Sequence, residues 1–179
     1  MTIKKTIIMK KITLILAATL FSLASFAQKY AYVDTKYILE NIPEYIQAQK
    51  TLDDLSEKWE TEIEAKKTNI QKKFQQYQAE ELLLPAEMKK KKQEEIYMLE
   101  DDLAKFQQKK FGVEGELFQK RKELIEPIQN KVYNAIKELA SVGNYDMIFD
   151  KANQTNILYA NPKLDKSKRI LKNLGYDTK

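Results

Sequence analysis

The sequence predicts an α+β protein in which a long antiparallel helical hairpin projects from a small strand-bearing body that oligomerises. Three observations predict this fold. A helical pattern free of glycine and proline runs from residue 44 to about 81, and a second apolar pattern at helical spacing follows Pro85. Strand-like segments occur only near the two ends of the mature chain. The chain has no cysteine, so disulfides cannot stabilise so small a body.

Residues 1–27 have the organisation of a secretory signal peptide. Lysines at the start precede an apolar stretch over 12–23, and Ser25-Phe26-Ala27 is a small-x-small cleavage site. The alternative, a membrane anchor, needs about 20 apolar residues, and this stretch has about a dozen. We therefore predict export and cleavage after Ala27.

Cleavage also changes the charge balance. The leader holds four of the 31 basic residues and no acidic ones, so the mature chain has 27 basic and 26 acidic residues, a net charge of +1. Nucleic-acid-binding domains are usually strongly basic. The composition therefore predicts no nucleic-acid partner.

No catalytic, cofactor-binding or metal-binding residues are predicted. The chain has neither histidine nor cysteine, which removes the usual zinc ligands and the commonest general base. Asp34, Asp146 and Asp150 do not match the spacing of a calcium loop, and capping or turn roles fit them better. No glycine-rich phosphate loop is present. The chain is therefore not expected to be an enzyme.

The body is predicted to comprise residues 28–42 and 128–179. Strands are expected at 29–33, 145–150 and 156–160, with an amphipathic terminal helix over 161–176. Three short strands bury little surface, so such a body is marginal alone and oligomerisation is expected. The strand residues expected to form the oligomer are Tyr30, Tyr32, Val33, Met147, Ile148, Phe149, Ile157, Leu158 and Tyr159.

Capping and stop residues mark the ends of the predicted helices. Asp34-Thr35 is a plausible N-cap for a short helix through Leu39, and Asn41 could cap the long helix that begins near Pro43. Gly143-Asn144 is a credible stop for the second hairpin arm. The terminal helix should bury Leu164, Ile170, Leu171 and Leu174.

The hairpin is predicted over 43–127, with its tip near 81–86. Pro85 restricts the residue before it and can open the next helix. The numbers of two residues that face each other across the hairpin should sum to about 167, which places Trp59 near Phe106. The same sum brings Pro43 level with Pro127 at the junction with the body, where Pro127 should kink or break the second helix.

Gly112 and Gly115 are expected inside the second helix, where each costs about 1 kcal/mol relative to alanine. Two interpretations remain open. The glycines could allow close packing against a bulky residue of the other arm, or they could form a flexible point in the hairpin.

The order of elements resembles the Skp/OmpH family of periplasmic chaperones. The resemblance rests on "KYAYVDTKYILENIPEY" near the start and "YDMIFDKANQTNILYANP" near the end, and it covers the mature chain, 28–179. It implies a homotrimer whose bodies associate and whose hairpins extend as tentacles around a cavity. It also implies a periplasmic, ATP-independent holdase that keeps unfolded outer-membrane proteins from aggregating.

The tip departs from the polar tips of that family. Leu82, Leu83 and Leu84 either include two residues that cap the hairpin's own core or expose at least one side chain to clients. The lysine run is either a solvated helix face or a positive patch for acidic clients or weak contact with anionic lipid. The candidate client contacts are Leu82, Leu83, Leu84, Met88, Lys89, Lys90, Lys91 and Lys92.

The alternative function is a structural coiled-coil protein or adaptor of the envelope without chaperone activity. Both functions fit a long charged hairpin. They differ in that only the holdase should suppress client aggregation.

Overall fold

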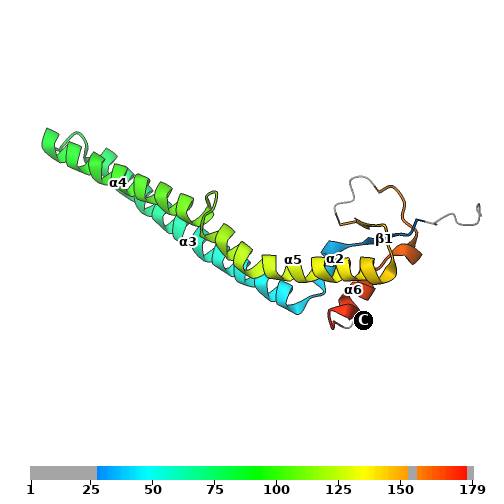
Figure 1. Ribbon diagram of the computed structural model, residues 1–179. Coiled ribbons are helices and arrows are strands. Elements are labelled where there is room, and N and C mark those ends of the chain that lie inside the picture. Colours follow the sequence, from blue (N-terminus) through cyan, green and yellow to red (C-terminus); the bar gives the residue numbers. More distant parts are fainter. Residues whose placement is uncertain (1–27, 153–156, 177–179) are drawn as a thin grey trace, which may run out of the picture.

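The computed structural model describes residues 28–152 and 157–176. Figure 1 shows a long helical hairpin with a small body at one end. The first arm is α3 (Pro43–Glu80), and the returning arm consists of α4 (Ala86–Phe111) and α5 (Glu116–Gly143). The body adds two short strands and the short helices α2 and α6. The α+β class and the helical hairpin are therefore confirmed.

The hairpin arms pair in a register one to three residues from the predicted one. Trp59 packs edge-on against Phe111 with ring centroids 5.9 Å apart, and Lys73 Nζ lies 2.7 Å from Glu95 Oε1. These pairs sum to 170 and 168 instead of 167. The turn is therefore centred nearer to Pro85 than expected, and the Trp59 ring packs on Phe111. Phe106 nevertheless lies near Trp59 as predicted, because Lys110 Nζ lies over both rings.

The returning arm is interrupted at an unexpected place. The second arm breaks over residues 112–115, so Gly112 and Gly115 do not lie inside a helix. Pro127 lies within α5, which continues unbroken to Gly143. Of the two outcomes expected at Pro127, the break is therefore wrong, and a kink stays a prediction. A proline removes only one helical hydrogen bond, and the flanking turns of α5 pack on the body core.

The sheet joins the two ends of the hairpin. β1 (Tyr30–Val33) and β2 (Met147–Asp150) pair in parallel, with Tyr30 opposite Met147. The whole hairpin forms the connection between them. On its other side, β1 forms one bridge from Tyr32 to Asp165.

The third predicted strand is absent from the described residues. Residues 157–160 form no ladder, and 153–156 lie outside the described part of the chain. Leu158 and Tyr159 project into solvent. A strand is defined by its pairing, and within one subunit this apolar segment has no partner strand.

Local caps define the small helices. α2 (Thr35–Glu40) begins as predicted, with Asp34 Oδ1 accepting a 2.9 Å hydrogen bond from the Tyr37 amide. Asn41 closes α2 and does not cap α3, whose N-cap is Ile42 with Pro43 next. α5 stops at Asn144, which adopts a left-handed conformation with φ of 49°.

The terminal helix is shorter than expected. α6 spans Ser167–Asn173, and a 3₁₀ turn, η1 (Pro162–Leu164), precedes it. Leu164 is exposed and does not join the core, because it lies in that turn. Ile170 and Leu171 are fully buried as predicted.

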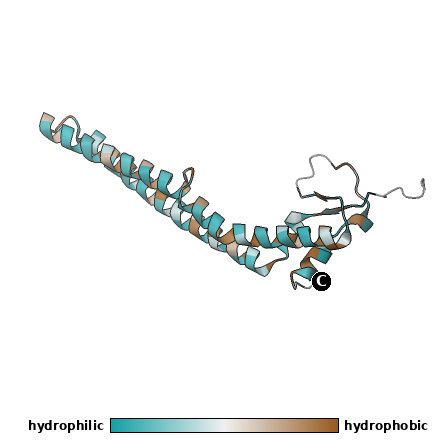
Figure 2. Ribbon diagram, in the orientation of Figure 1, coloured by the Kyte–Doolittle hydropathy of each residue, from teal (hydrophilic) through white to brown (hydrophobic). Residues whose placement is uncertain are grey.

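One core holds the body together and extends into the hairpin base. The buried cluster comprises Val33, Ile38, Ile42, Ala48, Leu52, Ile125, Ile128, Val132, Ala135, Leu139, Ile170 and Leu171. It therefore includes the first turns of α3 and most of α5. Figure 2 shows hydrophilic residues along much of the hairpin and hydrophobic ones gathered in the body.

Within the described residues, no helix combines the length and apolar composition that a membrane span requires.

Candidate functional site

The candidate functional features of the described residues are exposed surfaces on the hairpin and the body. Within 28–152 and 157–176, no three acidic, histidine or cysteine side chains gather as a metal site. Asp146 accepts a hydrogen bond from the Lys29 amide at 2.7 Å, and Asp150 accepts from Thr35 Oγ1 at 2.6 Å. With Asp34 as a cap, these carboxylates join the strand ends to their neighbours.

The hairpin tip exposes two leucines. Leu82 and Leu83 are 94% and 85% exposed, whereas Leu84 is half-buried. The interpretation in which two of them cap the hairpin core is therefore wrong. Tyr77 closes the core at this end, accepting a hydrogen bond from Gln93 Nε2 at 2.8 Å and donating one to Glu81 Oε1 at 3.0 Å. Burial and the Glu81 contact raise the pKa of the Tyr77 phenol.

The lysine run next to the tip is partly neutralised. Lys92 pairs with Glu80 across the turn, and Lys90 lies 3.9 Å from Glu94 on the same helix. The run therefore does not form a uniform positive patch. The sequence shows the lysines, but the acidic partner of Lys92 comes from the other arm. Met88 is also exposed, and client contact by these residues stays a prediction.

The middle of the hairpin holds a lysine among aromatic rings. Lys110 Nζ lies 4.7 Å from the centre of the Trp59 ring and 5.6 Å from that of Phe106, and its side chain is only 16% exposed. It also pairs with Glu116, the first residue of α5. We call Trp59, Lys110 and Glu116 the clasp, because they join both arms across the helix break. The hydrogen bond from Lys110 holds the pKa of Glu116 below its ordinary value of 4.5.

The helix break is a tight turn. The Gly115 amide donates to the Gly112 carbonyl at 2.8 Å, and Glu114 adopts a left-handed conformation with φ of 63°. A Cβ on Gly112 would lie 2.3 Å from the Gln108 carbonyl oxygen. The glycines thus permit close approach of the chain to its own backbone, not to the other arm. Flexibility at this point stays a prediction.

Val113 forms the outer part of this turn and is fully exposed. Beside it lies an open hollow of about 850 Å³, with Leu55 and Trp59 among its lining residues. The loop projects from the hairpin in Figure 1. The sequence gives no sign of this hollow, because it requires the glycine turn and the other arm together.

A contact between the terminal segment and α3 supports the base of the hairpin. The Tyr176 hydroxyl donates to the Glu44 carboxylate at 3.0 Å, one residue after Pro43. Burial, followed by the Glu44 contact, raises the pKa of Tyr176. Sequence patterns did not single out this pair, since 132 residues separate its members. The role of Pro43 and Pro127 as a junction stays a prediction.

The body exposes an apolar surface that we call the body face. Two rings on it, Tyr30 and Phe149, have centroids 6.4 Å apart. A shallow groove of about 610 Å³ lies over it. Of the predicted oligomer residues, Val33 is buried in the body core, and Tyr32 is buried where it lines the groove. Ile148 and Ile157 are half-buried. The body face consists of Tyr30, Met147, Phe149, Leu158, Tyr159 and Leu164.

Comparisons with known proteins agree with this architecture. The sequence model of the family described as outer membrane protein (OmpH-like) matches residues 29–174. The chaperone protein Skp of Yersinia enterocolitica is 28% identical over 151 residues, which cover 82% of this chain and 85% of that protein.

The crystal structure of a candidate OmpH-like outer membrane chaperone from Caulobacter crescentus superposes with a TM-score of 0.64. The match covers 82% of this chain and 83% of that one at 9% identity, which shows the fold alone. The resemblance inferred from the end segments is confirmed by the family match. The chain belongs to the family of OmpH-like outer membrane proteins.

Proposed function

We propose that the protein is an ATP-independent holdase of the periplasm that binds unfolded outer-membrane proteins and prevents their aggregation. The observation that carries the proposal is the family match, which spans the hairpin and both body segments. The relative named chaperone protein Skp supports the chaperone role. Export would depend on residues 1–27, which lie outside the described part of the chain.

The active form in this proposal is a homotrimer assembled through the body face. Exposed apolar patches rimmed by polar residues mark interaction surfaces. Leu158 and Tyr159 extend from a segment without a partner strand, so a neighbouring subunit could supply the missing pairing. Burial of these side chains would add the stability that a two-stranded body lacks.

Clients would be held by many weak contacts along the hairpins. Eight of the sixteen lysines and arginines of residues 43–127 form ion pairs, so the hairpin surface is hydrated and mixed in charge. Scattered apolar side chains remain exposed on this surface, among them Leu82, Leu83 and Val113. Weak contacts allow release without ATP, because folding of the client into its membrane competes with them.

The test is light scattering during dilution of a urea-denatured outer-membrane β-barrel, with mature protein at three subunits per client and no nucleotide. The proposal predicts suppressed scattering and a client that still inserts into added lipid. Unchanged aggregation by a correctly folded oligomer would contradict it and favour the structural coiled-coil alternative.

A further inference from the structure

The backbone at the junction of hairpin and body does not by itself fix the angle between them. α5 runs through the junction as a single helix, but Pro127 has no amide hydrogen to donate within it. The first arm is not continuous with the body, because α2 ends at Glu40 and α3 begins at Pro43, with residues 41 and 42 between them. Side-chain contacts must therefore set the angle at which the hairpin leaves the body.

The chain turns sharply after α6. The Tyr176 amide donates to the Leu171 carbonyl at 2.9 Å, and the Gly175 amide donates to the Lys172 carbonyl at 3.0 Å. Gly175 adopts the left-handed conformation, with φ of 87°. These features define a Schellman motif, in which a glycine ends the helix and the next residue packs back on its last turn. The glycine turn thus fixes the direction in which Tyr176 leaves α6.

This turn brings Tyr176 to the first turn of α3. Its hydroxyl donates to the Glu44 carboxylate, both oxygens of which lie 3.0 Å away. Its ring is half-buried and packs against the body core. Tyrosine suits this position because its ring is apolar and its tip is a hydrogen-bond donor. Burial raises the pKa of the phenol, so the hydroxyl keeps its proton at neutral pH.

α6 is itself anchored in the body. Ile170 and Leu171 are fully buried in the cluster that also holds residues of α2 and α5. At the start of α6, the buried Ser167 accepts a hydrogen bond from the Asp34 amide at 2.8 Å, which joins α6 to the start of α2. α6 therefore moves with the body, and the glycine turn extends this anchorage to the hairpin.

We propose that residues 171–176 form a strap that fastens the first arm of the hairpin to the body and limits how far the hairpin tilts. α3 has 38 residues and is about 57 Å long, so a tilt of about 10° at its base moves its far end by about 10 Å. In the proposed holdase, on which this consequence depends, the strap limits how widely the hairpins of an oligomer spread around a client.

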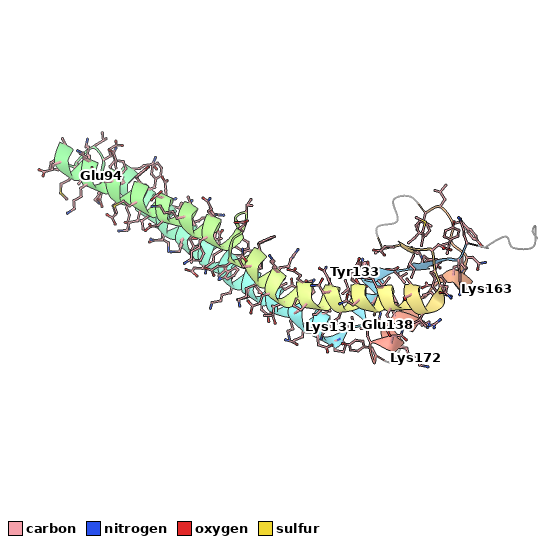
Figure 3. The ribbon with its side chains drawn as sticks, viewed as in Figure 1. Glu94, Lys131, Tyr133, Glu138, Lys163 and Lys172 are labelled. Carbon is pink, nitrogen blue, oxygen red and sulfur yellow. The ribbon has the colours of Figure 1, made fainter. Side chains whose placement is uncertain are left out.

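A purely local role explains less of this geometry. An acidic residue in the first turn of α3 is favourable without any partner, because it complements the helix dipole. The dipole does not account for Tyr176, which lies 132 residues away and is directed to Glu44 by a glycine turn. Tyr133 offers a contrast, since it is 60% exposed and its ring contacts Lys137 of its own helix. Figure 3 labels Tyr133 on α5 and Lys172 on α6.

The test is the distance distribution between spin labels on the hairpin and the body, measured by double electron–electron resonance without client. The chain has no cysteine, so Thr68→Cys on α3 and Glu138→Cys on the body part of α5 would be its two thiols. Both positions are exposed, and Figure 3 labels Glu138. Dilution of labelled protein into excess unlabelled protein removes distances between subunits.

We expect Tyr176→Ala to broaden the distribution about twofold, because the hairpin then samples more tilts. Tyr176→Phe, which removes only the hydroxyl, should broaden it less. Gly175→Ala should also broaden it, because a residue with a Cβ is strained at this φ and the turn would no longer direct Tyr176 to Glu44. The matched control, Tyr133→Ala, should keep the wild-type width.

A wild-type width in Tyr176→Ala, or equal broadening in Tyr133→Ala, would overturn the proposal. Circular dichroism should show unchanged helix content in Tyr176→Ala, because this residue lies after the end of α6. The distance measurement needs no client. It therefore tests the strap independently of the aggregation assay that tests the proposed function.

Discussion

Ile170 in the body and Ile96 in the distal hairpin are both buried isoleucines on helices, but their surroundings differ. Ile170 is fully buried and belongs to a cluster formed by four helices and a strand. Ile96 lies outside that cluster, between two antiparallel arms, and keeps slight exposure. A side chain in a multilayer core has neighbours on every side, whereas one between two helices has solvent nearby.

The two regions also differ in where their ion pairs lie. Ion pairs such as Lys73–Glu95 and Lys92–Glu80 join the hairpin arms, whereas the ion pair of the body found in the described residues, Lys36–Glu40, lies within α2. Ion pairs thus help to hold the two hairpin arms together, whereas the body is held together by its apolar core. The division of labour we propose agrees with this difference: hairpins hold clients, and bodies assemble.

The largest expected effect is a loss in the free energy of unfolding, which should differ between the buried isoleucines of the body and the distal hairpin. Ile170→Ala should reduce the free energy of unfolding by about 2–5 kcal/mol, because the rigid core cannot collapse around the cavity. Ile96→Ala should reduce it less, since two solvated helices can close around the gap. Urea unfolding followed by circular dichroism measures both. Equal losses would mean that the hairpin and the body form one equally rigid core.

Gly112→Ala is expected to have the next largest effect. The added methyl group would meet the Gln108 carbonyl oxygen, and relief of that clash should cost about 1–3 kcal/mol. The melting temperature and the fluorescence of Trp59, the chain's single tryptophan, report global and local changes. Val113→Ala, at a fully exposed position of the same turn, is the matched control and should change neither. An unchanged Gly112→Ala protein would contradict the tight turn.

A smaller effect is expected when Glu116 of the clasp is protonated at low pH. The folded pKa of Glu116 lies below 4.5, so its contribution to stability is complete above pH 4.5 and is lost as the pH falls through the folded pKa. Trp59 fluorescence should therefore change below pH 4.5 in the wild type. Glu116→Gln should remove that transition, whereas Glu123→Gln, which lies outside the clasp, should retain it.

The smallest effect on stability is expected at the tip. Leu82→Ser with Leu83→Ser should leave the free energy of unfolding within about 0.5 kcal/mol of the wild type, because both side chains are already exposed. If the tip contacts clients, aggregation of a denatured barrel should nevertheless be less well suppressed. A large loss of stability would contradict the exposed position of these leucines.

Periodicity and caps were enough to predict the hairpin and the body elements near its base. Asp34 before Thr35 and Asn144 after Gly143 act through their immediate neighbours, so their roles were readable from the chain. The prediction of a strand at 156–160 was wrong over the described residues 157–160, because a strand needs a partner that the local pattern does not supply. The break at 112–115 was missed, because the two glycines were placed within a continuous helix.

The surfaces were harder to predict than the elements. The exposure of Leu82 and Leu83 depends on Tyr77 closing the core, and the neutralisation of Lys92 depends on Glu80 of the other arm. The excess of basic residues in the body was hidden in a net charge near zero, because the acidic residues of the hairpin offset it. Contacts between distant segments therefore decide which charges and apolar groups remain available.

The most direct measurement compares client aggregation with wild-type protein and with Leu158→Lys/Tyr159→Lys, a variant of the body face. Both residues are exposed in one subunit, so the variant should keep its helices but fail to assemble. The account predicts that the wild type forms trimers and suppresses scattering of a diluted, denatured barrel, whereas the variant does neither. An assembled wild type that leaves the scattering unchanged would contradict it.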